Sequence, residues 1–186
     1  YEMRIGNKEL HDTILDVCKQ ADIDSGYIRL NVTRGTGLGL DPKNIDRSPN
    51  VMIMVSNLAL YPPEAYELGL HVVTSSMRVM PADCLDPRVK AIGKYVANIL
   101  AKHEGNRMGA GEALMLNQQG YIAECTGDNF FMVNGMTIKT PHPSCGLLAG
   151  ITRQTVIDLA RARGYQVEET FLTPFDVYTA DETFLT

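Results

Sequence analysis

The sequence predicts an α/β protein in two halves, and three observations support that prediction. Hydrophobic residues make up 45% and charged residues 21% of the 186 positions, which is the composition of an ordinary globular protein. Helical and alternating apolar patterns succeed each other along the chain. The run 81–90 contains prolines and no apolar period, which indicates a break. We therefore expect a small α/β domain over 1–82, a linker over 83–90 and a larger domain over 91–186.

One helix and three strands are predicted in the first half. The helix, over 8–20, is predicted by apolar residues at helical spacing: Leu10, Ile14, Val17 and Cys18. Strands are predicted where β-branched and aromatic residues gather: 27–34, 51–57 and 70–76.

Two helices among short strands are predicted in the second half. The first spans about 92–104, and its expected apolar face has four members: Ile92, Val96, Ile99 and Leu100. The second opens near Thr152 and stops at Gly164, with a smaller apolar face: Val156, Leu159 and Ala160. Polar turns separate the strands, as in a mixed or antiparallel sheet: 113–117, 121–124, 129–134, 136–140, 165–172 and 182–186.

Charge and apolar patterning exclude two classes of partner. Seventeen Lys and Arg against 22 Asp and Glu give a net charge of -5, and no basic run could neutralise a row of phosphates, so nucleic acid is not expected. The longest apolar stretches, such as 51–55, have only strand length, so a membrane is not expected either. Widely spaced cysteines without a CxxC pair are expected to be reduced, which predicts a soluble, cytoplasmic protein: Cys18, Cys84, Cys125 and Cys145.

Two apparent motifs are interpreted as ordinary loops. The glycines of 35–39 follow a predicted strand, as in a dinucleotide-binding loop, but they lack the GxGxxG spacing, and Pro42 comes where a helix should begin. His142 and Cys145 have no second pair of ligands at a zinc spacing, so no metal site is expected.

Three segments carry residues suited to chemistry. Lys90 stands at the mouth of a predicted helix, where the dipole disfavours a cation, although alone it would be a surface lysine. Glu124 ends a predicted strand and alone would be a solvated carboxylate. Gly150 precedes Ile151 and Thr152, whose amides at a helix N-terminus form an anion seat, although ordinary capping by Thr152 has the same pattern. An amine, an acid and a phosphate seat are the parts that a pyridoxal phosphate enzyme requires.

Taken together, these segments resemble the class IV aminotransferases, which are fold-type IV pyridoxal phosphate enzymes, and most closely the branched-chain amino-acid aminotransferases. Four pieces follow the family's order within residues 27–186: KAIGKYVANILAK, GAGEALMLNQQGYIAECTGDNFF, LLAGITRQTVIDLARARGYQVEE and ADETFLT. The resemblance implies a small α/β domain, a larger domain with a mixed-sheet pseudobarrel, and pyridoxal 5'-phosphate as cofactor.

The resemblance assigns roles to residues of the second half. Lys90 would be the Schiff-base lysine and would carry a proton between the substrate α-carbon and the cofactor. Glu124 would accept the hydrogen of the pyridine nitrogen, and Tyr95 would bond near the ring oxygen. Leu148 would pack against a ring face. The segment Gly150–Thr152 would hold the phosphate, with Ile151 and Thr152 as its donors.

Substrate binding is assigned to the first predicted strand. Tyr27 and Arg29 lie two apart and so share a face of that strand. By resemblance, Tyr27 would help to seat the α-carboxylate, and Arg29 would receive the distal carboxylate of glutamate, although a surface cross-strand pair would look the same. The expected reaction moves an amino group between a branched-chain L-amino acid and a 2-oxo acid such as 2-oxoglutarate, as in branched-chain amino-acid biosynthesis.

Departures from the family pattern keep alternatives open. D-amino-acid aminotransferases have an arginine and a histidine where this chain has Gly39 and Asp41, which argues against D-specificity, although these enzymes stay an alternative. The aminodeoxychorismate lyases share the fold and are a further alternative. Lys94 stands where branched-chain enzymes often have asparagine, and we assign it no role. A second phosphate anchor would precede Tyr1 and a Gly-Thr pair would follow Thr186, so both domains are expected to be incomplete. That expectation also leaves open a non-catalytic remnant. A homodimer or higher homo-oligomer is expected by resemblance.

Overall fold

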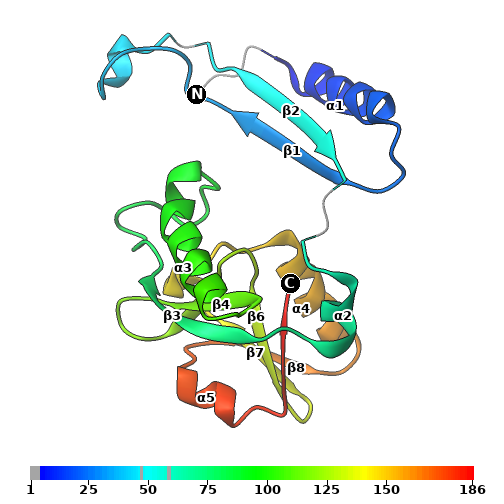
Figure 1. Ribbon diagram of the computed structural model, residues 1–186, viewed down its shortest axis with the longest axis vertical. Helices are drawn as coiled ribbons and strands as arrows, with labels where there is room; N and C mark the ends of the chain where they lie inside the picture. The colour runs from blue at the N-terminus through cyan, green and yellow to red at the C-terminus, as the bar shows by residue number, and fades with distance from the viewer. Residues whose placement is uncertain (1–4, 47, 58–59) are drawn as a thin grey trace. The chain divides into compact units, whose positions relative to one another are not determined.

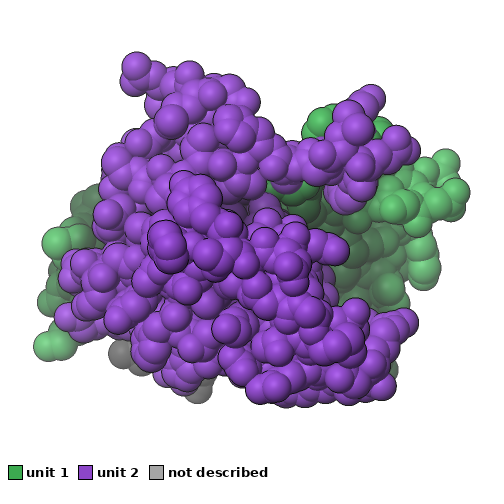
Figure 2. Space-filling model, turned by 90° about the horizontal axis from the view of Figure 1, so that it is seen from below, with its two compact units in different colours: residues 1–63 green, residues 64–186 purple. Residues whose placement is uncertain are grey.

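The chain divides into two compact units, residues 1–63 and 64–186 (Figures 1 and 2). The computed structural model describes residues 5–46, 48–57 and 60–186. The division comes earlier than the linker expected at 83–90. The reason is β3 (Val72–Arg78), which pairs in parallel with β4 (Glu112–Leu116) and therefore belongs to a sheet of the second unit.

The first unit is a helix packed on a two-stranded antiparallel ribbon (Figure 1). Helix α1 (Asn7–Ala21) and strands β1 (Tyr27–Val32) and β2 (Val51–Ser56) confirm the predicted elements within one or two residues at most ends. The glycine segment after β1 is a turn followed only by a short 3-10 helix, η1 (Pro42–Asn44). Gly35 has a φ of 98°, a backbone conformation that favours glycine.

The second unit holds two sheets. In the first, β4 lies between β3 and β5 (Ile122–Cys125), and β4 and β5 are antiparallel. The second has the order β8-β7-β6-β9. Its members are β6 (Phe130–Asn134), β7 (Thr137–Pro141), β8 (Gln166–Thr170) and β9 (Glu182–Leu185). The strands predicted here are confirmed within two residues. The strands β7 and β8 are parallel, and α4 (Ile151–Ala162) connects them.

Short helices that the sequence pattern did not predict complete the unit. Helix α2 (Pro63–Leu68) begins at a proline, which suits the first turn. Helix α5 (Pro174–Tyr178) has a capping box: the Thr173 side chain accepts from the backbone amide of Asp176, and the Asp176 carboxylate accepts from the amide of Thr173. The 3-10 turn η3 (Pro143–Cys145) follows β7.

The core of the second unit is built mainly by its strands. Phe131 is fully buried, stacks on Phe184 with ring centroids 4.9 Å apart, and packs with Ile157 of α4. On the other sheet, Met115 and Ala123 pack with Ala101 of α3 (Tyr95–Arg107). These contacts fix α3 and α4 on their sheets.

The apolar face expected for α3 is wrong. Its four members are exposed by 49 to 70%: Ile92, Val96, Ile99 and Leu100. The buried side instead consists of polar or small residues, on α3 itself and on the 3-10 turn η2 (Ile92–Lys94) before it: Lys94, Asn98, Ala101 and Gly105. The physical reason is that hydrogen bonds and an ion pair, rather than apolar area, attach this side of the helix to the sheet. The smaller face expected for α4 is partly wrong, since Leu159 is 50% exposed.

Two general expectations concern membranes and cysteines. Among the described residues, no helix is both long and apolar enough to cross a bilayer. All four cysteines are free thiols, and Cys125 and Cys145 are buried.

Candidate functional site

Glu124 is a buried carboxylate held on both of its oxygens. It lies in β5, its residue is 5% exposed, and Oε2 accepts a hydrogen bond from the backbone amide of Leu148 at 2.8 Å. Oε1 accepts from Nζ of Lys94 at 2.5 Å. The carboxylate therefore has a fixed orientation and a paired charge, as burial of a charged group requires. The expectation of an acid at this strand end holds, but Glu124 is not solvated.

Lys94 and Asn98 reach this carboxylate from the start of the helix. They are spaced i and i+4, so they share a helix face, and both are buried. Asn98 Nδ2 donates to the carbonyl of Thr126 at 2.9 Å and lies 3.5 Å from Oε1 of Glu124. Nζ of Lys94 also lies 5.3 Å from the ring centroid of Tyr95, within the range of a cation–π contact.

Lys90 lies four residues before Lys94 in the loop that leads into η2. It is exposed and makes no hydrogen bond or ion pair with any residue that the structure describes. The amine that reaches Glu124 is thus that of Lys94, which the sequence left without a role. Tyr95, by contrast, is half-buried at the first position of α3.

Hydrogen bonds connect Glu124 to the loop 146–150, which directly precedes α4. The amide of Leu148 donates to Glu124, and the carbonyl of Leu148 accepts from Asn129 Nδ2 at 2.8 Å. Oδ1 of the same asparagine accepts from the amide of Gly150 at 3.3 Å. A Cβ at Gly150 would lie 2.5 Å from this oxygen, so the loop requires glycine here. Asn129 therefore ties the acid-bearing strand to the helix tip.

The N-terminus of α4 is open to an anion. Gly150 is its N-cap, and no described side chain caps the helix. Ile151 and Thr152, its first two residues, are exposed, and amides at the start of a helix have no partner within it. The hydroxyl of Thr155 bonds back to the Ile151 carbonyl and leaves the tip clear. Thr152 is thus not the N-cap that ordinary capping would make it.

Cys125 follows Glu124 in β5, and its thiol does not belong to the reactive groups. Burial, reinforced by the nearby Glu112, Asp128 and Glu124 carboxylates, raises the pKa of Cys125 well above its ordinary value. A thiol that stays protonated is neither a nucleophile nor a metal ligand. Among the described residues, no group of three His, Cys, Asp or Glu is arranged to hold a metal.

Tyr27 and Arg29 lie in the first unit, on β1. They pair with Ser56 and Met54 of β2, and all four belong to the exposed side of the ribbon. Arg29 makes no ion pair or hydrogen bond with the described part of the chain. The two side chains share a face of β1, as predicted, and both are exposed.

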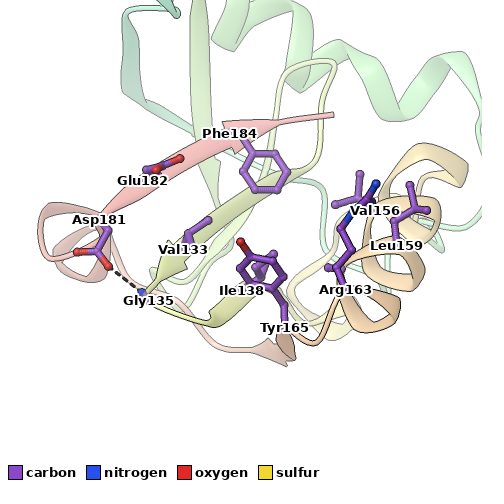
Figure 3. A pocket seen from close by; sticks show the side chains of 11 residues that line it. Val133, Gly135, Ile138, Val156, Leu159, Arg163, Tyr165, Asp181, Glu182 and Phe184 are labelled. Carbon is purple, nitrogen blue, oxygen red and sulfur yellow. Dashed lines mark hydrogen bonds between the residues drawn. The ribbon is translucent and has the colours of Figure 1, made fainter.

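A separate hollow of about 590 Å³ lies beside α4 on the four-stranded sheet (Figure 3). Its walls are mostly apolar: Val133, Ile138, Val156, Leu159, Tyr165 and Phe184. At its edge the carboxylate of Asp181 accepts a hydrogen bond from the amide of Gly135 at 2.8 Å (Figure 3). None of the residues expected to hold the cofactor lines this hollow, so we do not assign it to the site.

Sequence reasoning missed Lys94, Asn98 and Asn129 as parts of the site. The i, i+4 spacing of Lys94 and Asn98 was an available signal, because it put two polar residues on one helix face. Asn129 carried no comparable signal, since its role depends on a loop about twenty residues away in the sequence.

Comparison with known proteins assigns this arrangement to a family. The family described as Amino-transferase class IV matches residues 2–186. A Methanocaldococcus jannaschii protein, provisionally named a branched-chain-amino-acid aminotransferase, is 39% identical over all of this chain and 63% of its own length. The crystal structure of the Escherichia coli branched-chain amino acid aminotransferase is 31% identical with a TM-score of 0.95, over all of this chain and 62% of that one.

A third similar structure carries a ligand. It is a branched-chain amino acid aminotransferase from the organism abbreviated T.th., complexed with N-(5'-phosphopyridoxyl)-L-glutamate. This protein is 34% identical with a TM-score of 0.88, over all of this chain and 59% of that one. The chain thus spans about three fifths of the length of these relatives.

Proposed function

Because the chain belongs to the class IV aminotransferases, we propose that the complete protein uses pyridoxal 5'-phosphate to move an amino group between a branched-chain L-amino acid and a 2-oxo acid such as 2-oxoglutarate. The observation that carries the proposal is the fixed link between Glu124 and the open tip of α4, through Leu148, Asn129 and Gly150.

The residues present fit this cofactor on their chemistry. Its protonated ring nitrogen needs an anion, and Glu124 is a buried carboxylate. Its phosphate needs several donors, and the uncapped helix tip offers the amides of Ile151 and Thr152. Leu148 lies between these two features and would pack on the ring.

When bound, pyridoxal phosphate supplies an electron-withdrawing ring that stabilises negative charge at the substrate α-carbon. Lys90 is the residue we propose to join to it and to carry a proton at that carbon. In a pyridine ring the aldehyde-bearing carbon lies opposite the nitrogen, so one amine cannot touch the acid and bond the aldehyde at the same time. Lys94 lies 2.5 Å from Glu124, which favours the exposed Lys90, four residues earlier. Tyr95 would donate to the ring oxygen.

Tyr27 and Arg29 are our proposed substrate contacts. Both are exposed on one face of β1, and a guanidinium can bind a carboxylate with two parallel hydrogen bonds. The relative complexed with a phosphopyridoxyl derivative of L-glutamate supports glutamate and 2-oxoglutarate as one substrate pair. A homo-oligomer, a dimer or larger, is also part of the proposal, and light scattering would test it.

The decisive assay incubates the complete protein with pyridoxal phosphate, leucine and 2-oxoglutarate and measures glutamate formation. Release of pyruvate from aminodeoxychorismate without amino transfer would instead identify a lyase, and activity with D-amino acids alone would reverse the proposed stereospecificity. Borohydride reduction followed by peptide mass spectrometry should place the cofactor on Lys90. A protein that never becomes yellow with pyridoxal phosphate would be a non-catalytic remnant.

A further inference from the structure

The most unusual feature of the site is that the amine at the acid belongs to Lys94 and not to Lys90. Lys94 is 4% exposed and its ammonium lies 2.5 Å from Oε1 of Glu124, which is 5% exposed. Oε2 is already occupied by the amide of Leu148 at 2.8 Å. Each oxygen of the carboxylate thus already has one donor, and the donor at Oε1 is a cation.

The pair places the cofactor and Lys94 in competition. A buried carboxylate without a partner is costly, so a cation must stay with Glu124 when no cofactor is bound. Within the part of the chain that the structure describes, the cation paired with this carboxylate is Lys94. If the cofactor binds through its protonated ring nitrogen, a second positive group arrives at the same carboxylate. The two cations repel each other there, which favours withdrawal of Lys94.

We propose, on the basis of the proposed function, that Lys94 is a positioning residue that takes the place of the cofactor's ring nitrogen at Glu124. Its ammonium holds the carboxylate charged and oriented in the cofactor-free protein. The binding of pyridoxal phosphate displaces that contact, so Lys94 lowers the affinity for the cofactor while stabilising the apoprotein.

The contacts around the pair support this assignment over a purely structural one. Asn98 bonds mainly to the carbonyl of Thr126 at 2.9 Å, and its 3.5 Å contact with Glu124 is a weak one. If Lys94 moves, Asn98 keeps its own partner. The helix is also attached by a second ion pair, Lys102 with Glu112 at 3.2 Å, so Lys94 can release Glu124 without undocking α3.

The test measures cofactor affinity by absorbance in the complete protein and in the variants Lys94→Gln and Lys94→Arg. Each protein is titrated with pyridoxal phosphate and with its carbocyclic analogue, in which carbon replaces the ring nitrogen. Lys94→Gln should bind pyridoxal phosphate at least about tenfold more tightly than the parent, a change that corresponds to about 1.4 kcal/mol. Its affinity for the analogue should not rise, and Lys94→Arg, which keeps the cation, should resemble the parent.

A matched control is Lys102→Gln, which breaks the other ion pair of the same helix. It should weaken the fold without changing the preference between the two ligands. Should Lys94→Gln be unfolded alone, it should refold with pyridoxal phosphate and not with the analogue. Failure of both ligands to restore its fold would overturn the inference.

The outcomes separate the inference from the function beneath it. A parent protein that binds no pyridoxal phosphate refutes the proposed function. If the parent binds pyridoxal phosphate, the Lys94→Gln variant decides the role of Lys94. Affinities for pyridoxal phosphate and for the analogue that change equally, or not at all, refute that role alone. A borohydride-reduced peptide labelled at Lys94 also refutes that role, because it would make Lys94 the covalent residue.

Discussion

The stability of the apoprotein should depend strongly on the buried pair of Lys94 and Glu124, and a double-mutant cycle can measure this. The perturbations are Lys94→Met, Glu124→Gln and the two together. Both side chains are almost fully buried, with 5% and 6% of their surface exposed. Removing one partner from such a pair typically costs about 3–5 kcal/mol, because the other charge is left buried and unpaired.

The structure refines these magnitudes. In Lys94→Met, Glu124 keeps the hydrogen bond from Leu148, so we expect a loss near the lower end, about 3 kcal/mol. In Glu124→Gln, the amide oxygen can still accept from Leu148, but the ammonium loses its counter-ion, and we expect a similar loss. The double variant buries no unpaired charge and should lose only about 1–2 kcal/mol. The two single losses together exceed this by about 4–5 kcal/mol, which is the expected coupling energy.

Urea unfolding followed by circular dichroism is the suitable assay, because the chain contains no tryptophan. The measured quantity is the free energy of unfolding of the cofactor-free protein, compared at equal slope with denaturant. Single-variant losses that simply add, within about 0.5 kcal/mol, would refute the reasoning. Such additivity would mean that the two charges do not meet in the folded protein.

Three further predictions concern other parts of the second unit. Gly150→Ala should weaken pyridoxal phosphate binding at least about tenfold in a titration, because a Cβ would lie 2.5 Å from Oδ1 of Asn129. Unchanged affinity would contradict the role of the loop that contains Gly150. Cys125 should resist alkylation in the native protein while the exposed Cys84 reacts, as peptide mass spectrometry would reveal, because burial raises the pKa of Cys125. A hydrogen bond from the hydroxyl of Ser75 lowers the pKa of Glu104 from its ordinary value of 4.5. The stability that this carboxylate adds is therefore present above a pH of 4.5 and is lost as the pH falls through the lower folded pKa. In acid the parent should thus lose its higher free energy of unfolding relative to Glu104→Gln. A difference that persists there would be inconsistent with this contact.

Local patterns predicted most of the elements and the acid and anion ends of the site. The strands over 113–140 and the helix that starts at Ile151 were readable because alternation, turn residues and a glycine before the helix are local signals. Glu124 stood out as an acid at a strand end. These features needed no knowledge of what lies next to them in space.

The unpredicted features depend on contacts between distant segments. The unit boundary falls near residue 63 because β3 pairs with β4, some forty residues later. The inward side of α3 is polar because an acid of β5 and a carbonyl just after it lie there as acceptors for Lys94 and Asn98. A rule that expects apolar residues inside therefore predicts the wrong buried face for such a helix.

The polar inner side of α3 also determines where the helix can lie along its sheet. Apolar surfaces can slide slightly over one another, whereas hydrogen bonds require particular directions. At successive turns, Lys94, Asn98 and Lys102 each meet a different acceptor. One residue inserted within this stretch would rotate the following turns by about 100° and break the later contacts together. The same insertion in the exposed part of the preceding loop would leave all of them intact, so changes of chain length should be tolerated before the helix and rejected within it.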